Sequence, residues 1–347
     1  MSPVRIAVAG CGLIGREHIQ RILQSERCSL AATIDPTPEA AEYASSLPGQ
    51  HFSDLGAVLR AKLADAIILA TPNHLHAQQA TECVEAGLTV LVEKPVTDSL
   101  ETAQKLVQLV DAKSARVLVG HHRAHSPIMR EAERIVKEGV LGKLVGIQGS
   151  ATFYKPDHYF DAGPWRKKKG GGPVLINLIH EIGNLRQIAG EIEAVEALAS
   201  NATRQFEVED TAAIPFRFAS GALATFLLSD TAASARSWEQ TAQENPSYST
   251  YDDEDCYVVS GTQGTLSVPT MRIKRFADGV ERSWWKEFEC SVQPIERQDP
   301  LILQLEHFCD LAQGLVAPKV SAFDGMQNLR LVDAIERSIA TGRVIKL

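Results

Sequence analysis

Three glycines near the start of the chain, Gly10, Gly12 and Gly15, have the spacing of a turn that binds a dinucleotide. Gly10 would permit a tight turn, Gly12 would let a pyrophosphate approach the backbone, and Gly15 would let a helix close against a strand. Leu13 and Ile14 stand between them, where the free N–H groups and the dipole of that helix would bind the anion. The pattern therefore predicts a dinucleotide-binding turn.

An acidic residue stands at the position expected for binding the ribose of the cofactor. Asp35 follows Gly15 by 20 positions (35 − 15) and comes directly after a predicted strand at 30–34. A spacing of about 20 residues is typical of the carboxylate that accepts hydrogen bonds from the ribose hydroxyls. Because such a carboxylate repels a 2′-phosphate, we expect NAD rather than NADP as the cofactor.

A lysine that could stabilise negative charge follows another predicted strand, at 88–92. Lys94 stands there within the tripeptide Glu93-Lys94-Pro95. Ligands of open α/β sheets bind at the carboxyl ends of the strands, so Lys94 would lie near the nicotinamide end of the cofactor. A solvated surface lysine is the alternative interpretation, and the strand-end position disfavours it.

The elements that must position these residues alternate between strand and helix over the first 120 residues. Apolar and β-branched runs predict strands at 4–9, 30–34, 65–70, 88–92 and 116–120. Helical spacing predicts helices between them, two of which would begin at the N-caps Asn73 and Asp98. This alternation predicts right-handed crossovers and an α/β fold, with a doubly wound parallel sheet in a Rossmann domain at 1–122.

The pattern changes in the rest of the chain, which we predict to be a second, α+β domain at 123–347. It consists mainly of strands joined by turns and has predicted helices at 126–138, 174–189, 300–313 and 324–341. This pattern favours an open, largely antiparallel or mixed sheet. The polar segment 229–255 has few strand signals and is expected to form the edge of a pocket. The terminal helix is expected to pack toward the first domain.

Composition narrows the class of protein. The 347 residues are 44% hydrophobic and 22% charged, as in ordinary soluble globular proteins, and the net charge of −8 gives no basic surface for nucleic acid or an anionic membrane. The six cysteines show no C-x-x-C pairing, so neither a zinc cluster nor a disulfide framework is expected. No apolar run is long enough to span a membrane. With a strand predicted from Val4, we expect no signal peptide and a cytoplasmic protein.

Five short motifs stand along the chain: the glycine-rich turn at 10–15, Thr71-Pro72-Asn73 with His74 and His76, Glu93-Lys94-Pro95, Gly170-Gly171-Gly172 with His180 eight residues later, and Asp324-Gly325. Together they resemble the Gfo/Idh/MocA family of glucose–fructose oxidoreductases and inositol dehydrogenases. The resemblance covers nearly the whole chain. It implies transfer of a hydride between NAD and a secondary alcohol of a cyclic polyol, sugar, hydroxy acid or related hydroxy compound, without a metal.

The resemblance also implies roles for individual residues. Lys94 and His180 would flank the reacting carbon, and the peptide bond before Pro95 is often cis in the family. Cofactor contacts beyond the glycine turn and Asp35 would come from Thr71, Pro72, Asn73, His76, Glu93, Lys94, Trp165 and Arg166. Substrate contacts would come from His122, Arg123, Tyr154, His158, Asn177 and His180. On the residues alone, a histidine on an apolar helix is more often a satisfied core residue.

One position departs from the family pattern. The family commonly has an aspartate four residues before the histidine, where this chain has Ile176. Asn177, three residues before His180, is on an adjacent part of the helix face and could orient the site, but it cannot supply charge. A structural capping role for Asn177 is the alternative. Glu181 is expected to point elsewhere.

Two further stretches have chemistry-bearing side chains. The segment His121-His122-Arg123-Ala124-His125 could indicate a metal, but no carboxylate or cysteine stands at ligand spacing beside it, so a strand-end loop facing substrate or cofactor is favoured. The loop with Lys155, His158 and residues 166–169 is basic and could meet a substrate carboxylate. A solvated charge run is the simpler interpretation of Lys167, Lys168 and Lys169.

Other functions remain open on the sequence alone. The same scaffold could serve an NAD-using glycosidase that acts by transient oxidation and elimination, or a non-catalytic regulator that depends on the dinucleotide. In each case we expect a small-molecule ligand, and a homodimer or homotetramer formed through the exposed face of the C-terminal sheet.

Overall fold

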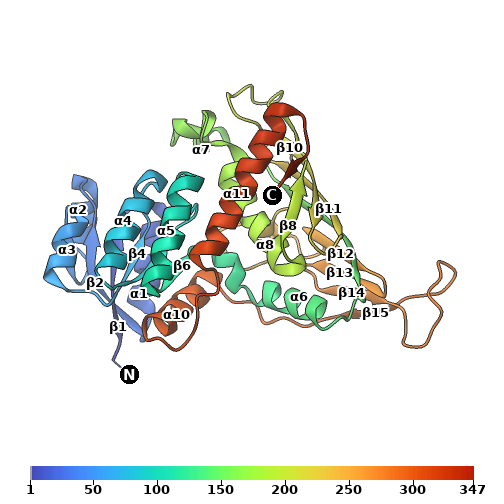
Figure 1. The fold of residues 1–347 in the computed structure, drawn as a ribbon, viewed down its shortest axis with the longest axis horizontal. Helices are drawn as coiled ribbons and strands as arrows, with labels where there is room; N and C mark the ends of the chain where they lie inside the picture. Colours follow the sequence, from blue (N-terminus) through green and yellow to red (C-terminus); the bar gives the residue numbers. More distant parts are fainter. Residues whose placement is uncertain (1) are drawn as a thin grey trace. The chain divides into compact units, whose positions relative to one another are not determined.

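The structure is a computed structural model that describes residues 2–347 (Figure 1). The chain forms two compact units. Unit 1 contains the residues up to His125 together with Pro300–Leu329, and unit 2 contains Ser126–Asp299 and Arg330–Leu347. Compactness alone does not define a folding domain, so the limits 1–122 and 123–347 remain a prediction.

Unit 1 is built on a six-stranded parallel sheet with the strand order β3-β2-β1-β4-β5-β6. Its strands are β1 (Val4–Ala9), β2 (Cys28–Ile34), β3 (Gln50–Phe52), β4 (Ala66–Leu69), β5 (Thr89–Val92) and β6 (Val117–Val119). All neighbouring strands pair in parallel. The doubly wound parallel sheet is confirmed. Strand order reverses between β1 and β4, where such sheets bind ligands.

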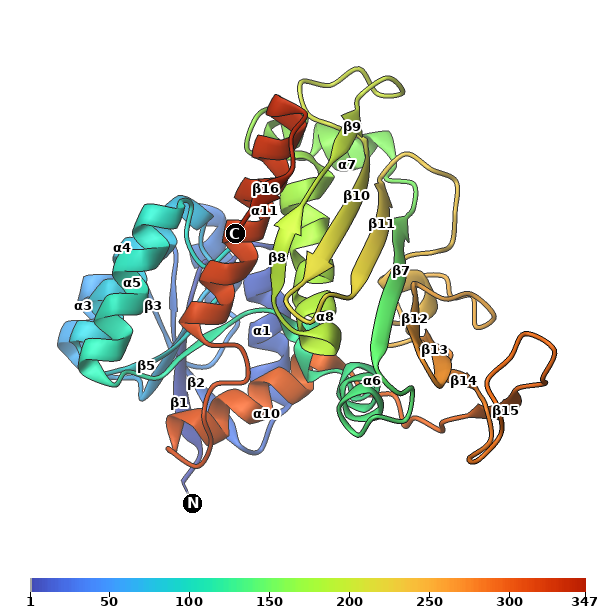
Figure 2. The same cartoon turned by 45° about the vertical axis from the view of Figure 1, so that its right-hand side comes forward.

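Helices cover both faces of this sheet. They are α1 (Leu13–Gln24), α2 (Pro38–Ala44), α3 (Leu55–Ala61), α4 (Asn73–Glu85), α5 (Leu100–Lys113) and α10 (Pro300–Ala312). Helix α1 packs with α10 and α4 packs with α5, and Figure 2 shows the two pairs on opposite sides of the sheet. Strands β4, β5 and β6 are buried at every position, and so is β1 apart from Arg5, which explains why their sequences are almost continuously apolar.

Two predicted N-caps are wrong. Asn73 is the first residue of α4 and follows Pro72 at the cap position, where no side chain caps the helix. Helix α5 begins one residue later than Asp98 would place it, because the hydroxyl of Ser99 accepts the N–H of Thr102. The carboxylate of Asp98 instead accepts the Thr102 hydroxyl. Neighbouring polar residues compete for a cap, and the sequence alone does not rank them.

Unit 2 is built on a ten-stranded mixed sheet. Nine of its strands follow the order β15-β14-β13-β12-β7-β11-β10-β8-β16, and β9 pairs with β10. They are β7 (Leu144–Thr152), β8 (Ile192–Val195), β9 (Leu198–Ser200), β10 (Thr211–Phe218), β11 (Leu223–Ser229), β12 (Tyr257–Gly261), β13 (Gly264–Val268), β14 (Arg272–Arg275), β15 (Glu289–Val292) and β16 (Ile345–Lys346). Among the strand pairs that the structure describes in unit 2, only β7–β11 is parallel. The mixed, mostly antiparallel sheet is confirmed.

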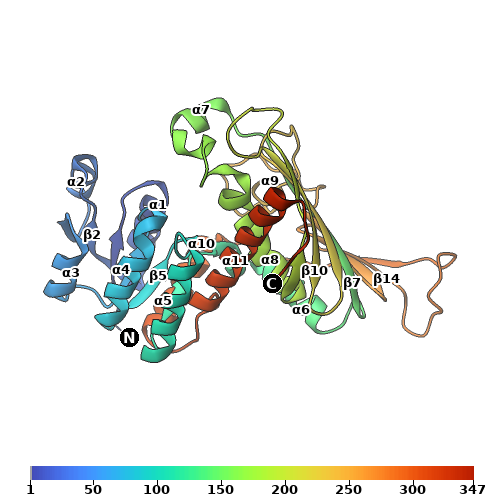
Figure 3. The same cartoon turned by 45° about the horizontal axis from the view of Figure 1, so that its top comes forward.

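One face of this sheet packs on helices. Helices α6 (Pro127–Lys137), α8 (Ile179–Ala189) and the later part of α11 (Ala322–Thr341) lie on the same side, as Figure 3 shows. Burial alternates along β10, where Ile214 and Phe216 are buried and Ala213 and Pro215 are exposed. The alternation shows that the face opposite the helices carries apolar side chains in contact with solvent.

Some local features of unit 2 differ from the sequence prediction. The helix predicted at 174–189 begins as a π-helix, η3 (Val174–Leu178), before continuing as α8. The polar segment 229–255 contains a short helix, α9 (Trp238–Thr241). Strand β15 was not predicted, because all four of its residues are exposed and leave no buried alternation in the sequence.

Within residues 2–347, no helix combines the length and apolar character that a membrane span requires.

Candidate active site

The turn between β1 and α1 has the geometry that its glycines predict. Gly10 has φ +91°, and a Cβ there would lie 2.5 Å from the carbonyl oxygen of Ala70. A Cβ on Gly15 would lie 1.9 Å from the carbonyl oxygen of Gly10. A Cβ on Gly12 would meet no atom within 4 Å, and no side chain caps the start of α1. The turn therefore leaves open backbone at a helix N-terminus, which fits a pyrophosphate.

Asp35 lies directly beside this turn. Its Oδ2 accepts the N–H of Cys11 at 2.9 Å, and its Oδ1 accepts the hydroxyl of Thr37 at 2.7 Å. Burial alone would raise the pKa of Asp35, but these hydrogen bonds hold the pKa below its usual value. The carboxylate is ionised at neutral pH and placed where a ribose next to the bound pyrophosphate would lie. The residues present thus fit a dinucleotide.

Arg16, which the sequence motif did not single out, completes the turn. Its Nε donates to the carbonyl oxygen of Cys11 at 2.9 Å, and its guanidinium lies 4.3 Å from the ring centre of Tyr43. The only sequence signal for it is a cation in the first turn of the helix after Gly12. It adds positive charge near the site predicted for the phosphates.

His76 links the loops that follow β4 and β5. It is buried, with Nε2 2.8 Å from the carbonyl oxygen of Thr71 and Nδ1 2.8 Å from the carbonyl oxygen of Pro95. Burial lowers the pKa of His76. Both ring nitrogens face backbone carbonyl oxygens of unit 1, so the imidazole lies between the two loops and positions the one that carries Lys94.

Glu93 holds the backbone of Lys94 through a hydrogen bond. It is buried, it pairs with His18 at 2.9 Å, and its Oε2 accepts the backbone N–H of Lys94 at 3.2 Å. Burial alone would raise the pKa of Glu93, but the hydrogen bond from His18 and the charge of Lys94 keep the pKa below its usual value. The Lys94–Pro95 peptide bond is cis, as the resemblance implied. Lys94 itself is half-buried at the carboxyl end of β5.

The histidine-rich segment after β6 forms a short 3₁₀ helix, η1 (His122–His125). His122 is half-buried, whereas Arg123 is only 2% exposed. His121 is buried and lies 3.1 Å from the amide nitrogen of Asn328. Of the two residues predicted to face the substrate, His122 is the more accessible. In the part of the chain that the structure describes, no three His, Cys, Asp or Glu residues are grouped to hold a metal.

His180 lies in the first turn of α8, in unit 2. The preceding helix η3 is anchored by Glu209, whose Oε1 accepts the N–H of Val174 at 2.9 Å. Gly172 has φ +79°, and a Cβ there would lie 2.6 Å from the same Glu209 oxygen. Burial raises the pKa of Glu209 despite this hydrogen bond. Glu209 therefore fixes the glycine turn to the helix that carries His180.

Glu181 points into the core of unit 2. It accepts the hydroxyl of Tyr257, to which the amide nitrogen of Asn184 also donates at 3.0 Å. All three side chains are buried. The network holds α8 against the sheet.

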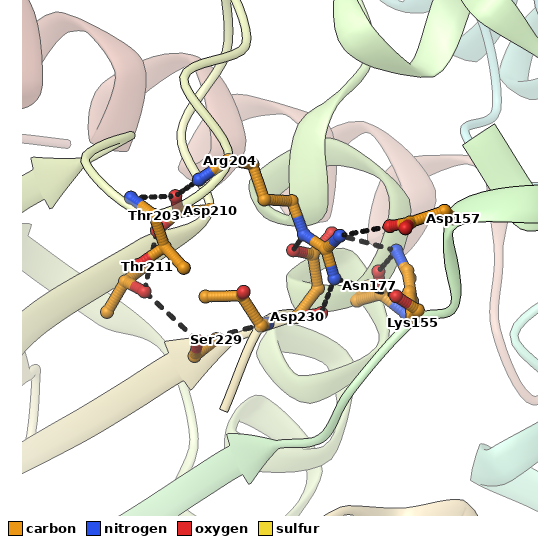
Figure 4. A network of polar contacts seen from close by, with 10 residues as sticks. Lys155, Asp157, Asn177, Thr203, Arg204, Asp210, Thr211, Ser229 and Asp230 are labelled. Carbon is orange, nitrogen blue, oxygen red and sulfur yellow. Dashed lines mark hydrogen bonds and ion pairs between the residues drawn. The ribbon is translucent and has the colours of Figure 1, made fainter. Parts of the chain in front are cut away.

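Asn177 lies in η3, three residues before His180, and bonds to a residue that the motif did not include. The ammonium of Lys155 donates to its Oδ1 at 2.7 Å (Figure 4). Sequence analysis placed Lys155 only within a basic loop. Its partners come from segments far apart in sequence, so no local pattern could have identified the pair.

The other predicted residues of unit 2 lie on the segment 154–169. Tyr154, His158 and Trp165 are exposed, while Arg166 stacks 3.9 Å from the ring centre of Tyr159 and donates to its carbonyl oxygen. Lys167 pairs with Asp161 at 3.0 Å. The exposed aromatic and imidazole groups are free to meet a ligand, and the guanidinium of Arg166 is committed to packing.

Comparison with known proteins bears on this site. Residues 4–121 match the model of an oxidoreductase family with an NAD-binding Rossmann fold, and residues 129–267 match the GFO/IDH/MocA C-terminal domain. The chain is 25% identical to inositol 2-dehydrogenase of Rhizobium meliloti (strain 1021) over 99% of both proteins. It is 26% identical to 1,5-anhydro-D-fructose reductase of Ensifer adhaerens, over 82% of this chain and 80% of the relative.

A solved structure is similar along the whole chain. The WlbA dehydrogenase from Bordetella pertussis, in complex with NADH and UDP-GlcNAcA, has a TM-score of 0.79 and 25% sequence identity. The alignment covers 99% of this chain and 99% of that protein. The resemblance therefore extends over both units.

Proposed function

Because the chain belongs to the Gfo/Idh/MocA oxidoreductase family and is homologous to inositol 2-dehydrogenases, we propose that it is a dehydrogenase acting on a CH–OH group. In this proposal a hydride passes between NAD and a secondary alcohol of a cyclic polyol, sugar or related hydroxy compound. The observation that carries it lies within unit 1. A buried Glu93 fixes Lys94 at the end of β5, in the same sheet as the open glycine turn and Asp35.

The cofactor of the proposal is NAD. Its pyrophosphate would lie on the open backbone at Gly12 to Gly15, and Asp35 would accept hydrogen bonds from its ribose. When bound, the dinucleotide supplies hydride chemistry at its nicotinamide ring. The remaining cofactor contacts proposed are those of Thr71, Pro72, Asn73 and Trp165. The buried side chains of His76 and Glu93 would act by positioning the loop that carries Lys94, and Arg166 by packing on Tyr159.

Two residues have different proposed roles at the substrate: Lys94 stabilises charge, and His180 transfers a proton. Lys94 donates a hydrogen bond to the substrate oxygen and stabilises the negative charge that develops on it. His180 takes the hydroxyl proton in the oxidation direction and returns it in the reduction direction. Asn177 orients the substrate beside His180, and further substrate contacts come from His122, Arg123, Tyr154 and His158.

A substrate screen tests this function. The protein is incubated with NAD and a panel of polyols, sugars, hydroxy acids and aryl glycosides, and the absorbance of NADH and of released aglycone is followed. We expect NADH with at least one alcohol. Release of aglycone without net NADH would contradict the proposal and favour the redox-neutral glycosidase.

Two variants then test the residues. Lys94→Met and His180→Gln should each lower kcat by about 100-fold or more, while NADH affinity stays within about threefold of the wild type. Lys105→Met is the matched control, because Lys105 is exposed on α5 and pairs with the exposed Glu101. Wild-type turnover by either active-site variant would remove that residue from the proposal.

We also propose that a second copy of the chain covers the open face of the unit 2 sheet. Leu223 and Leu227, which are 56% and 47% exposed, lie on that face together with Pro215. Leu198 and Leu227 line a hollow of about 410 Å³ there. Exposed apolar groups gathered on one sheet face support a homodimer or homotetramer.

A further inference from the structure

Lys155 lies at one end of the unit 2 sheet, where its partners come from η3 and from the segments that flank β10 and β11. It follows β7, and its ammonium lies 2.7 Å from Oδ1 of Asn177 and 3.5 Å from Oδ2 of Asp230. Asp230 comes directly after β11, and Arg204 precedes β10. Strand β7 is parallel to β11, and the end of β11 pairs with the start of β10. The register therefore brings these residues together at the same end of the sheet.

The position of Lys155 is fixed by its backbone as well as its side chain. Its N–H donates to the carbonyl oxygen of Asp230 at 2.9 Å. Nη2 of Arg204 donates to the carbonyl oxygens of both Lys155 and Asp230, at 2.7 and 2.6 Å, and Figure 4 shows the guanidinium beside these groups. The ammonium also lies 4.9 Å from the ring centre of Tyr159. The side chains of Lys155 and Arg204 are only 11% and 6% exposed, so neither can swing freely.

This arrangement determines how the Asn177 amide points. A lysine ammonium has donors and no acceptor, so the amide oxygen must face Lys155 and the amide nitrogen must face away. Among residues 2–347 nothing accepts a hydrogen bond from that nitrogen, and the side chain is half-buried rather than enclosed. Asn177 therefore presents two unused N–H donors, one helical turn before His180.

The charges behind the amide strengthen these donors. Asp230 is a single buried carboxylate shared between Lys155 and Arg204, whose Nε lies 3.1 Å from Oδ1 of Asp230. Asp157 lies 3.7 Å from Arg204 but is 90% exposed, so its charge is largely screened by solvent. Asp210 accepts the N–H of Arg204 and is drawn at the end of the network away from Lys155 (Figure 4).

A cation in direct contact with the amide oxygen polarises the amide and makes its N–H groups better donors. Hydrogen bonds from such donors are strongest when the acceptor is ionised. The oxygen that suits this position is therefore that of a carboxylate, and a hydroxyl group suits it less well.

We propose that Lys155 is a positioning residue that fixes Asn177 as a hydrogen-bond donor, and that this donor selects substrates with a carboxylate, such as uronates and sugar acids. The proposal rests on the proposed function for the place of the substrate beside His180. Beyond that function, it identifies the chemical group of the substrate that faces Asn177.

Matched pairs of an acid and its neutral analogue test the selection. The pairs are D-glucuronate with D-glucose, D-galacturonate with D-galactose, and D-gluconate with D-glucitol. For each pair we measure kcat/KM with NAD, and the Kd for the NADH-bound protein by calorimetry. The wild type should prefer the acid by about tenfold or more in at least one pair. Equal values within every pair would overturn the proposal.

Two variants distinguish the role of Asn177 as the hydrogen-bond donor from the role of Lys155 in positioning it. Asn177→Asp keeps the shape but presents only acceptors, so the acid preference should disappear while the neutral partner is affected less. Lys155→Met should raise KM for the acid by about threefold to tenfold with a smaller change in kcat, and Lys155→Arg should restore part of the preference. A purely structural role would lower both members of a pair equally.

Lys137→Met is the matched control, because Lys137 is 70% exposed on α6 and pairs with Glu133. It should leave every ratio unchanged. An acid preference that persists in both Asn177→Asp and Lys155→Met would overturn the proposal. The Kd values keep this outcome distinct from failure of the proposed function, which would appear as an absence of NADH with every compound.

Discussion

Asp35 is held by three donors from two segments of the chain. The N–H of Cys11 belongs to the glycine turn, and the N–H and hydroxyl of Thr37 belong to the start of α2. These bonds keep the carboxylate ionised and point it toward the turn. We propose that Asp35 binds the ribose and sets the choice between NADH and NADPH, so that a substitution of this residue tests both.

At this residue, Asp35→Ser should weaken NADH binding by about 10- to 100-fold, the range for losing a hydrogen bond to a charged group. Binding of NADPH should weaken less or improve, because the repulsion of a 2′-phosphate is removed. Fluorescence titration of both cofactors measures the ratio. Asp111→Ser, an exposed position on α5, is the control. If the NADH to NADPH ratio did not change, Asp35 would not be the ribose ligand.

The residues of the candidate site differ in whether neighbouring or distant parts of the sequence fix their positions. The roles of Gly10, Gly12 and Gly15 follow from backbone space within one turn, and the sequence predicted them. Lys155 and Glu209 act on η3 from loops that precede it and follow it in the sequence. Their positions depend on strand register in the unit 2 sheet, which no motif records.

At the scale of the elements, the glycines of the β1–α1 turn differ in whether there is space for a side chain. Gly12 has φ −74° and ψ −167°, which any residue can adopt, and open space where its Cβ would be. Gly15 has no such space, because the carbonyl oxygen of Gly10 occupies it. Packing therefore requires a glycine at position 15 but not at position 12, and we propose that the bare backbone of Gly12 serves the ligand.

We expect Gly12→Ala to change the free energy of unfolding by no more than about 0.5 kcal/mol while weakening NADH binding by about tenfold or more. Gly15→Ala should lower the free energy of unfolding by about 1–3 kcal/mol, because the turn must move to admit the methyl group. Urea denaturation and NADH titration check the pair. Equal loss of stability in the two variants, or NADH binding by Gly12→Ala as tight as in the wild type, would refute this division.

Most elements could be predicted from apolar periodicity, and each one that could not has its own physical reason. A π-helix and an α-helix differ by less than one residue per turn, so five residues of η3 give no distinct periodicity. The exposed strand β15 has no buried side chains to alternate. The N-cap of α5 fell on Ser99 because two adjacent residues were both able to cap.

For the whole molecule, the central question outside the site is what covers the open face of the unit 2 sheet. Helices bury the other face, and β10 and β11 alternate so that both expose apolar groups to solvent. A second copy that packs on this face would remove those groups from water, at about 25 cal/mol for each Å² of apolar surface.

Leu227→Lys places a charge in the centre of that face and should shift the protein toward a smaller assembly. Light scattering coupled to size-exclusion chromatography should give a dimer or tetramer for the wild type and mainly a smaller species for the variant. Leu315→Lys, at an exposed apolar position outside the sheet, should behave as the wild type. A wild-type monomer, or an unchanged mass for Leu227→Lys, would show that the assembly does not use this face.

The direct transfer of a hydride from substrate to cofactor is the central claim about the molecule. The most direct measurement uses the alcohol identified in the screen, deuterated at its carbinol carbon, with NAD and the wild-type protein. Mass spectrometry of the dinucleotide should find deuterium in the NADH formed, and Lys94→Met should form that product about 100-fold more slowly. NADH without deuterium, or conversion of the substrate with no labelled NADH at all, would contradict the account.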